Sequence, residues 1–244
     1  VRGPSGIGKN RLVQEFYLNL QRKPRLIFCT GRPLIGCAPF EPLIEGLRMA
    51  VKPEEWQALP NEFKNPLRDL FPELQAEDPG KVSESPELEA QEDFLRICAA
   101  LHHLLIQLAS KKPLLLVMDI FIWVDDATMD FLSYLSDRGF FKAHGLLILI
   151  SRKEESSLPF EVFVDRNQMT GMLETINVPP LTRFESDLLV QRILGIEPSK
   201  PFLQKFYLQT GGNPYFITEG LKSLRPIDFH FQELITTLAI VVQP

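Results

Sequence analysis

The chain of 244 residues contains few of the residues that build disulfide frameworks and metal clusters: three cysteines and four histidines. Cys29, Cys37 and Cys98 lie far apart and form no C-x-x-C pair, which predicts small buried side chains in a reducing compartment. No two histidines have the i, i+4 spacing of a helical metal pair. We therefore expect structural roles for all four, His102, His103, His144 and His230.

The chain also lacks a run of basic residues and a long apolar segment. It has 26 lysines and arginines against 31 aspartates and glutamates, a formal net charge of −5. This balance argues against direct binding of this segment to nucleic acid or to an anionic membrane. The longest apolar run, Pro113–Met118, is far too short to cross a bilayer, and no signal-peptide pattern is present. We expect a cytoplasmic protein with no membrane partner.

A glycine-rich loop at residues 3–10 is the strongest motif that is present. It reads Gly-Pro-Ser-Gly-Ile-Gly-Lys-Asn and follows the pattern Gly-x-x-x-x-Gly-Lys-Ser/Thr except at its last position. In such loops the backbone N–H groups surround phosphates, and the lysine reaches the β and γ oxygens. Helical spacing of apolar residues over 11–20 adds the positive end of a helix. The motif predicts phosphate binding by Gly3, Gly6, Gly8 and Lys9.

The last position of the loop departs from the pattern. Asn10 stands where a Ser or Thr hydroxyl ligates Mg²⁺, and its amide oxygen is a neutral and bulkier ligand. Only Val1 and Arg2 precede Gly3, so we expect the first strand of the fold to be missing and the chain to be a fragment. A plain turn that caps a helix remains the alternative interpretation of residues 3–10.

Apolar strands alternate with amphipathic helices over most of the chain. Strands are predicted at 25–29, 113–119, 145–152 and 173–178. Helices are predicted at 40–51, 88–110 and 127–135, with short helices over 56–74 broken at Pro60, Pro66 and Pro72. The unbroken apolar runs at 113–118 and 145–150 are typical of central strands in a parallel sheet with helices on both faces. This alternation predicts an α/β fold whose ligands lie at the carboxyl ends of the strands.

The pattern changes to helices alone after residue 180. We predict helices at 183–194, 198–210 and 214–224, which would form a small all-helical lid. The polar, acidic stretch 75–87 predicts a mobile connection. The predicted domains are a nucleotide-binding α/β domain at 1–180, a helical lid at 181–226, and the truncated start of a further element at 227–244.

Polar residues follow the two most apolar strands. Asp119 is placed to hold Mg²⁺ through water, and Arg152 to contact a γ-phosphate, against the simpler alternatives of a solvated aspartate and a surface arginine. Ile120 stands where a second acid would polarise the attacking water. For Asp125 and Asp126 we favour capping of the helix that follows over a catalytic role.

Several ordered motifs resemble those of one family. They are the phosphate loop, the strand 114–119, and the segments 38–43, 70–74, 123–128 and 210–216. Together they are similar to the AAA-type P-loop ATPase module of STAND signalling proteins, found in large bacterial transcriptional activators and beside class III nucleotide cyclase domains.

The resemblance implies a P-loop NTPase-type sheet, ATP and Mg²⁺ as cofactors, and roles for matched positions. Lys9 and the loop glycines would hold phosphate, Asn10 and Asp119 would hold Mg²⁺, and Arg152 would sense the γ-phosphate. Pro214 would pack near adenine. The preference for ATP over GTP rests on the resemblance alone.

Two functions remain open from the sequence. The first is an ATP-binding regulatory switch in which the lid closes over nucleotide and controls an attached output domain, with weak or absent hydrolysis and with self-association as a further possibility. The second is a scaffold for protein interaction that has lost nucleotide chemistry, for which Asn10 and Ile120 argue. Lys9 argues against the scaffold, which has no physical need of that lysine.

Overall fold

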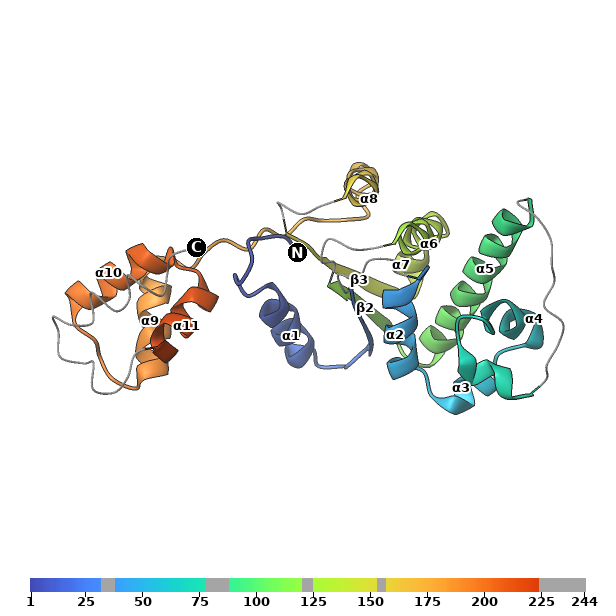
Figure 1. Ribbon diagram of the computed structural model, residues 1–244, viewed down its shortest axis with the longest axis horizontal. Coiled ribbons are helices and arrows are strands. Elements are labelled where there is room, and N and C mark those ends of the chain that lie inside the picture. The colour runs from blue at the N-terminus through green and yellow to red at the C-terminus, as the bar shows by residue number, and fades with distance from the viewer. Residues whose placement is uncertain (32–37, 78–87, 120–124, 153–156, 224–244) are drawn as a thin grey trace. The chain divides into compact units, whose positions relative to one another are not determined.

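The computed structural model of the chain describes residues 1–31, 38–77, 88–119, 125–152 and 157–223. The chain divides into two compact units. One is contiguous, Phe16–Thr175, and is called the sheet unit. The other joins Val1–Glu15 to the residues from Ile176 onward and is called the loop–helix unit. Figure 1 labels the helices of both units and the strands β2 (Leu114–Asp119) and β3 (Gly145–Ile150).

The sheet unit is built on three parallel strands in the order β1-β2-β3. They are β1 Arg25–Thr30, β2 Leu114–Asp119 and β3 Gly145–Ile150. Arg25 pairs with Leu114, and Leu114 pairs with Gly145, so the three strands start in register. Every residue of β2 is buried, as its unbroken apolar sequence predicts for a strand with a partner on each side. The predicted α/β fold with a parallel sheet is confirmed.

The prediction that residues 145–152 form a second central strand is wrong for the part of the chain that the structure describes. There β3 pairs with β2 alone. Its first four residues are only partly covered, and Leu146 is 50% exposed. The apolar run predicted burial along the whole strand. The structure buries only the carboxyl end, at Leu149 and Ile150.

Helices flank the sheet and supply most of the core. α2 packs on β1 so closely that a Cβ at Gly46 would lie 2.7 Å from Cys29 Sγ, which explains a glycine inside this helix. α4 packs along the long helix α5 (Figure 1). The helices of the sheet unit are α2 Glu41–Ala50, α3 Pro53–Gln57, α4 Asn61–Lys64, α5 Leu88–Lys111, α6 Asp126–Asp137, α7 Phe140–Ala143 and α8 Leu158–Met169, with 3₁₀ turns at Asn65–Leu67 and Pro72–Glu77.

The proline-broken helices predicted over 56–74 are confirmed. α3 ends at Gln57, and Pro60 occupies the N-cap of α4. Pro66 lies within the first 3₁₀ turn, and Pro72 begins the second. Proline cannot donate a helical hydrogen bond, so each short helix stops near one and the chain turns repeatedly beside α5. The stretch 78–87, most of the predicted mobile connection, lies outside the described residues.

The strand predicted at 173–178 is not formed. Asn177 makes one isolated parallel bridge with Arg2. Arg2 N donates to Ile176 O at 2.8 Å and Arg2 O accepts from Val178 N at 2.8 Å. Because the loop begins at the next residue, Gly3, only the pair Arg2 and Asn177 is bridged here, whereas a strand needs several consecutive pairs.

The carboxyl-terminal helices predicted from residue 181 are confirmed. α9 Arg183–Leu194, α10 Lys200–Thr210 and α11 Pro214–Ser223 lie together in Figure 1. Thr182 and Glu185 form a capping box at the start of α9, and Gly195 ends that helix with a φ of 68°. The helices share a small core of Val190, Leu203, Phe206, Ile217 and Leu221. The predicted domain boundaries stay predictions, and residues 224–244 lie outside the described part.

The cysteines and histidines that the structure describes are packed as expected. Cys29 and Cys98 are buried, and burial raises the pKa of each thiol to about 12. The ring of His103 stacks on Phe63 at 4.0 Å, and the ring of His102 meets Tyr134 edge-on. Burial lowers the pKa of His102 below its ordinary value. Cys37 and His230 lie outside the described residues.

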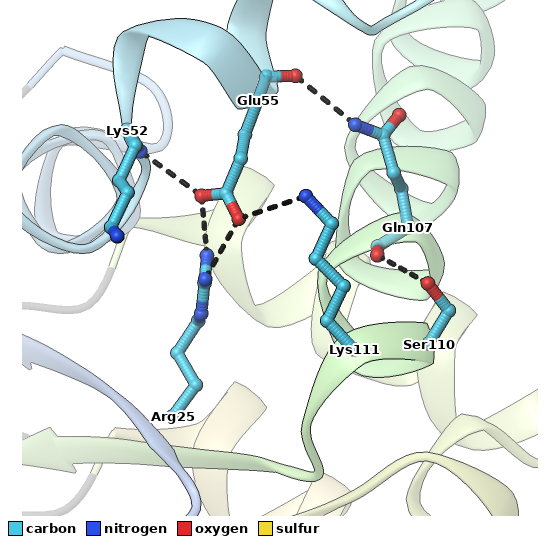
Figure 2. Close-up of polar contacts among 6 residues, drawn as sticks. All are labelled: Arg25, Lys52, Glu55, Gln107, Ser110 and Lys111. Atoms are coloured by element: carbon cyan, nitrogen blue, oxygen red, sulfur yellow. Dashed lines mark hydrogen bonds and ion pairs between the residues drawn. The ribbon is translucent and has the colours of Figure 1, made fainter.

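A buried carboxylate joins three elements of the sheet unit (Figure 2). Glu55 of α3 is 4% exposed and accepts hydrogen bonds from both terminal nitrogens of Arg25, at 2.6 and 2.7 Å. Lys111 Nζ of α5 lies 3.5 Å away, and Lys52 N donates to the same carboxylate at 3.1 Å. Gln107 of α5 donates to the backbone oxygen of Glu55. The hydrogen bond from Arg25 is the main reason that the pKa of Glu55 falls to about 2.

We predict that Glu55→Gln lowers the free energy of unfolding at pH 7 by about 3 kcal/mol, the value that a pKa drop from 4.5 to about 2 corresponds to. A depressed pKa stabilises the fold above pH 4.5 and loses that effect as the pH falls toward 2. The difference from wild type should therefore shrink to about 1 kcal/mol at pH 3 in urea unfolding. Glu54→Gln, at the exposed neighbour, is the control and should change little. A difference that is independent of pH would contradict the assignment.

Candidate functional site

The phosphate loop takes up backbone conformations that need glycine. Gly6 has a φ of 73° and Gly8 a φ of 97°, both in the left-handed region that residues with a Cβ rarely adopt. α1, Lys9–Asn19, begins directly after Gly8, and Leu12 N donates to Gly8 O at 2.9 Å. The loop therefore turns sharply and delivers the chain into the first turn of a helix, whose N–H groups favour an anion.

The side chain of Lys9 folds back over the start of the loop. Its ammonium donates to Gly3 O and to Pro4 O, each at 2.8 Å, and the residue is only 9% exposed. These bonds close the loop on itself and hold a positive charge beside its backbone. A phosphate at the loop would meet both the N–H groups and this charge. Asn10, the next residue, is exposed on the first turn of α1.

The start of α11 contacts the same loop within the loop–helix unit. Asn213 Nδ2 donates to Ser5 O at 2.9 Å, and Tyr215 N lies 3.2 Å from Gly6 O. Pro214, between them, is the first residue of α11. The structure thus brings Pro214 next to the loop residues, while its predicted role at adenine stays a prediction.

Two of the residues that the sequence singles out, Asp119 and Arg152, lie in the sheet unit, at or after the carboxyl ends of β2 and β3. Asp119 is 6% exposed and ends β2, and its backbone oxygen accepts from Gly31 N at 3.2 Å. It pairs with Ile150, so Ser151 and Arg152 follow at the same edge of the sheet. Ile120 lies outside the described residues. The roles predicted for Asp119 and Arg152 stay predictions.

Ser151, to which no role was predicted from the sequence, lies in an unusual environment. The residue is 4% exposed, and its hydroxyl oxygen is buried with no hydrogen-bond partner among the described residues. A buried unsatisfied hydroxyl costs roughly 1–3 kcal/mol, so few are retained without a use. The signal in the sequence was a hydroxyl residue directly after an apolar strand.

Asp125 is a helix cap, as the sequence analysis favoured. Its carboxylate accepts from Thr128 N at 2.8 Å and from Thr128 Oγ1 at 2.6 Å at the start of α6. It also accepts from Phe40 N at 3.0 Å. Phe40 has a φ of 64°, and this bond holds the strained residue at the N-cap of α2. Asp125 therefore has a structural role in joining α2 to α6.

Two comparisons with known proteins bear on this site. A family model described as AAA ATPase domain matches residues 1–149, which include the phosphate loop, β1, β2 and all of β3 except its last residue. A search of curated proteins gives no match to the chain. Among the described residues, no helix is both long and apolar enough to cross a membrane.

We predict unequal costs for alanine at the two left-handed glycines of the loop. Gly8→Ala meets no atom within 4 Å and should lower the free energy of unfolding by about 1–2 kcal/mol through backbone strain alone. Gly6→Ala adds a Cβ 2.5 Å from Tyr215 Cβ and should cost about 1–3 kcal/mol more. Urea unfolding measures both, with Gly195→Ala as the matched control because its φ is 68° and it has space. Equal costs for Gly6 and Gly8 would show that α11 does not contact the loop.

Proposed function

This chain belongs to the AAA ATPase domain family, and from that premise we propose that it is an ATP-binding regulatory module of the STAND type. Nucleotide binding would act as a switch on an attached output domain, with hydrolysis slow or absent. Self-association is a further part of the proposal. The observation that carries the proposal is the formed phosphate loop, with left-handed glycines at 6 and 8 and the ammonium of Lys9 held beside its backbone.

The residues of the loop fit a nucleotide phosphate. A Cβ at Gly3 would lie 2.9 Å from Val178 O, so the backbone can run here only without a side chain. Gly6 and Gly8 allow the turn, and Lys9 supplies the charge. A scaffold without nucleotide needs neither a buried lysine nor two left-handed glycines in this spacing. The loop is therefore better explained by phosphate than by capping of α1.

The residues that would hold Mg²⁺ favour binding of ATP more than its hydrolysis. Mg²⁺, when bound, would neutralise phosphate charge and orient the γ-phosphate. We assign its protein ligands to Asn10 and, through water, to Asp119, whose buried position at a strand end suits a carboxylate that holds one ion. Arg152 would contact the γ-phosphate. Asn10 in place of a hydroxyl, and Ile120 in place of an acid, would make hydrolysis slow.

The helical region would report the nucleotide state. α11 starts with hydrogen bonds to the carbonyls of Ser5 and Gly6, so a phosphate that orders the loop also biases the position of this helix. Pro214 lies at this junction and would pack near adenine. The alternative of a scaffold without nucleotide keeps both arguments in its favour: the exposed Asn10 at the position of the metal-binding hydroxyl, and Ile120 at the position of the second acid.

We predict that the chain binds ATP in isothermal titration calorimetry and that Lys9→Met abolishes binding, because the ammonium is lost while its aliphatic volume is kept. Arg11→Ala is the control. Arg11 lies two positions from Lys9, and its exposed charge pairs with Glu15. Its removal should leave the affinity for ATP within about twofold of wild type. Absence of ATP binding by the wild-type chain would leave the scaffold as the better interpretation.

Asn10→Ser tests the cation site. We expect it to increase the gain in ATP affinity that Mg²⁺ provides by about tenfold, because the hydroxyl is a smaller and better ligand at this position. Titrations with Mg²⁺ and with EDTA give the ratio for each variant. A ratio equal to that of wild type would show that residue 10 does not reach the cation.

A further inference from the structure

One side chain of the helical region is bonded on two sides at the phosphate loop. The amide nitrogen of Asn213 donates to Ser5 O at 2.9 Å, and its amide oxygen accepts from Tyr215 N at 3.0 Å. The second bond is that of a helix N-cap at the start of α11. The first bond joins residues 208 positions apart in the sequence. Asn213 therefore caps a helix and holds the loop with the same amide.

The bond to Ser5 matters because of the way a phosphate loop works. The N–H and C=O of a trans peptide point in opposite directions, so a loop that turns N–H groups toward an anion turns carbonyls away from it. Those carbonyls need donors elsewhere. In this loop the donors are Lys9 for Gly3 and Pro4, Asn213 for Ser5, Tyr215 for Gly6 and Leu12 for Gly8.

Three of these five carbonyls are held by α1 and two by the start of α11. The contact at α11 is tight, since a Cβ on Gly6 would lie 3.0 Å from Asn213 Oδ1 and 2.5 Å from Tyr215 Cβ. The middle of the loop is therefore held in its shape by residues from the far end of the chain. Residues next to the loop in sequence, Lys9 and Leu12, supply the donors for the other three carbonyls.

We propose that Asn213 is a positioning residue for nucleotide binding, a role that rests on the function proposed above. Its amide holds the Ser5 carbonyl so that the loop presents its N–H groups to phosphate. By linkage, phosphate bound at the loop strengthens the contact between loop and α11 by the same free energy. An amide is suited to this position because it carries a donor and an acceptor together.

Two substitutions separate the contact from the helix cap. Asn213→Ser keeps an N-cap side chain but has no amide to reach Ser5. Asn213→Asp keeps the shape and the cap, and turns an acceptor toward the Ser5 carbonyl. Ser199→Ala is the control in the same unit, because it removes the side chain that caps α10 at Phe202 N. It should lower stability without reaching the loop.

Loss of the contact should appear in two measurements. In hydrogen–deuterium exchange without nucleotide, residues 3–8 should exchange about fivefold faster in both Asn213 variants, the effect of one hydrogen bond, while α9 and α10 stay as protected as in wild type. In calorimetry the Kd for ATP should rise about fivefold in both. Ser199→Ala should change neither quantity.

The outcomes distinguish this inference from the proposed function. Failure of the wild-type chain to bind ATP overturns the function, and loop exchange still reports on the contact. ATP binding by wild type and by both variants alike, with unchanged loop exchange, overturns the inference and leaves the function. An effect of Asn213→Asp alone also overturns it, since that result would reflect repulsion between a carboxylate and the phosphates.

Discussion

The pairing of β2 on both of its edges is the constraint on which the sheet unit depends. Its six residues are all buried, so each must satisfy its backbone through a neighbouring strand. That requirement fixes the register of β1 and β3 and brings the ends of all three strands to one edge. The register also fixes the positions of the polar residues at this edge, because the apolar runs stop at Asp119, Ser151 and Arg152.

Local pattern was sufficient to predict most of the secondary structure. The apolar runs at Arg25–Thr30 and Leu114–Asp119, the prolines around α4, and the caps of the last helices each act within a few residues of sequence. The prediction of a strand at 173–178 was wrong because β-propensity does not reveal whether a partner strand is long enough to form a ladder. The apolar run of β3 was misjudged for a related reason, since it records hydrophobicity and not the number of neighbours.

The candidate site was predictable to the same extent. The loop glycines and Lys9 act through a motif of eight consecutive residues, and their conformation agrees with it. Asn213 entered the sequence analysis only within the motif segment 210–216, because nothing in its sequence neighbours points to Ser5. Ser151 carried a weak signal whose meaning depends on burial, which the sequence does not measure. The residues that hold a loop in shape are harder to find than those that would touch its ligand.

The discontinuity of the loop–helix unit has a consequence for the order in which the chain folds during synthesis. The sheet unit is one continuous stretch, and all of its partners are available once Thr175 has been made. The phosphate loop is synthesised before the sheet unit, yet the donors to two of its carbonyls, Asn213 and Tyr215, are synthesised after that unit. A nascent chain that has completed its sheet unit therefore still carries an incomplete phosphate loop, which can reach its final structure only after the start of α11 has been made.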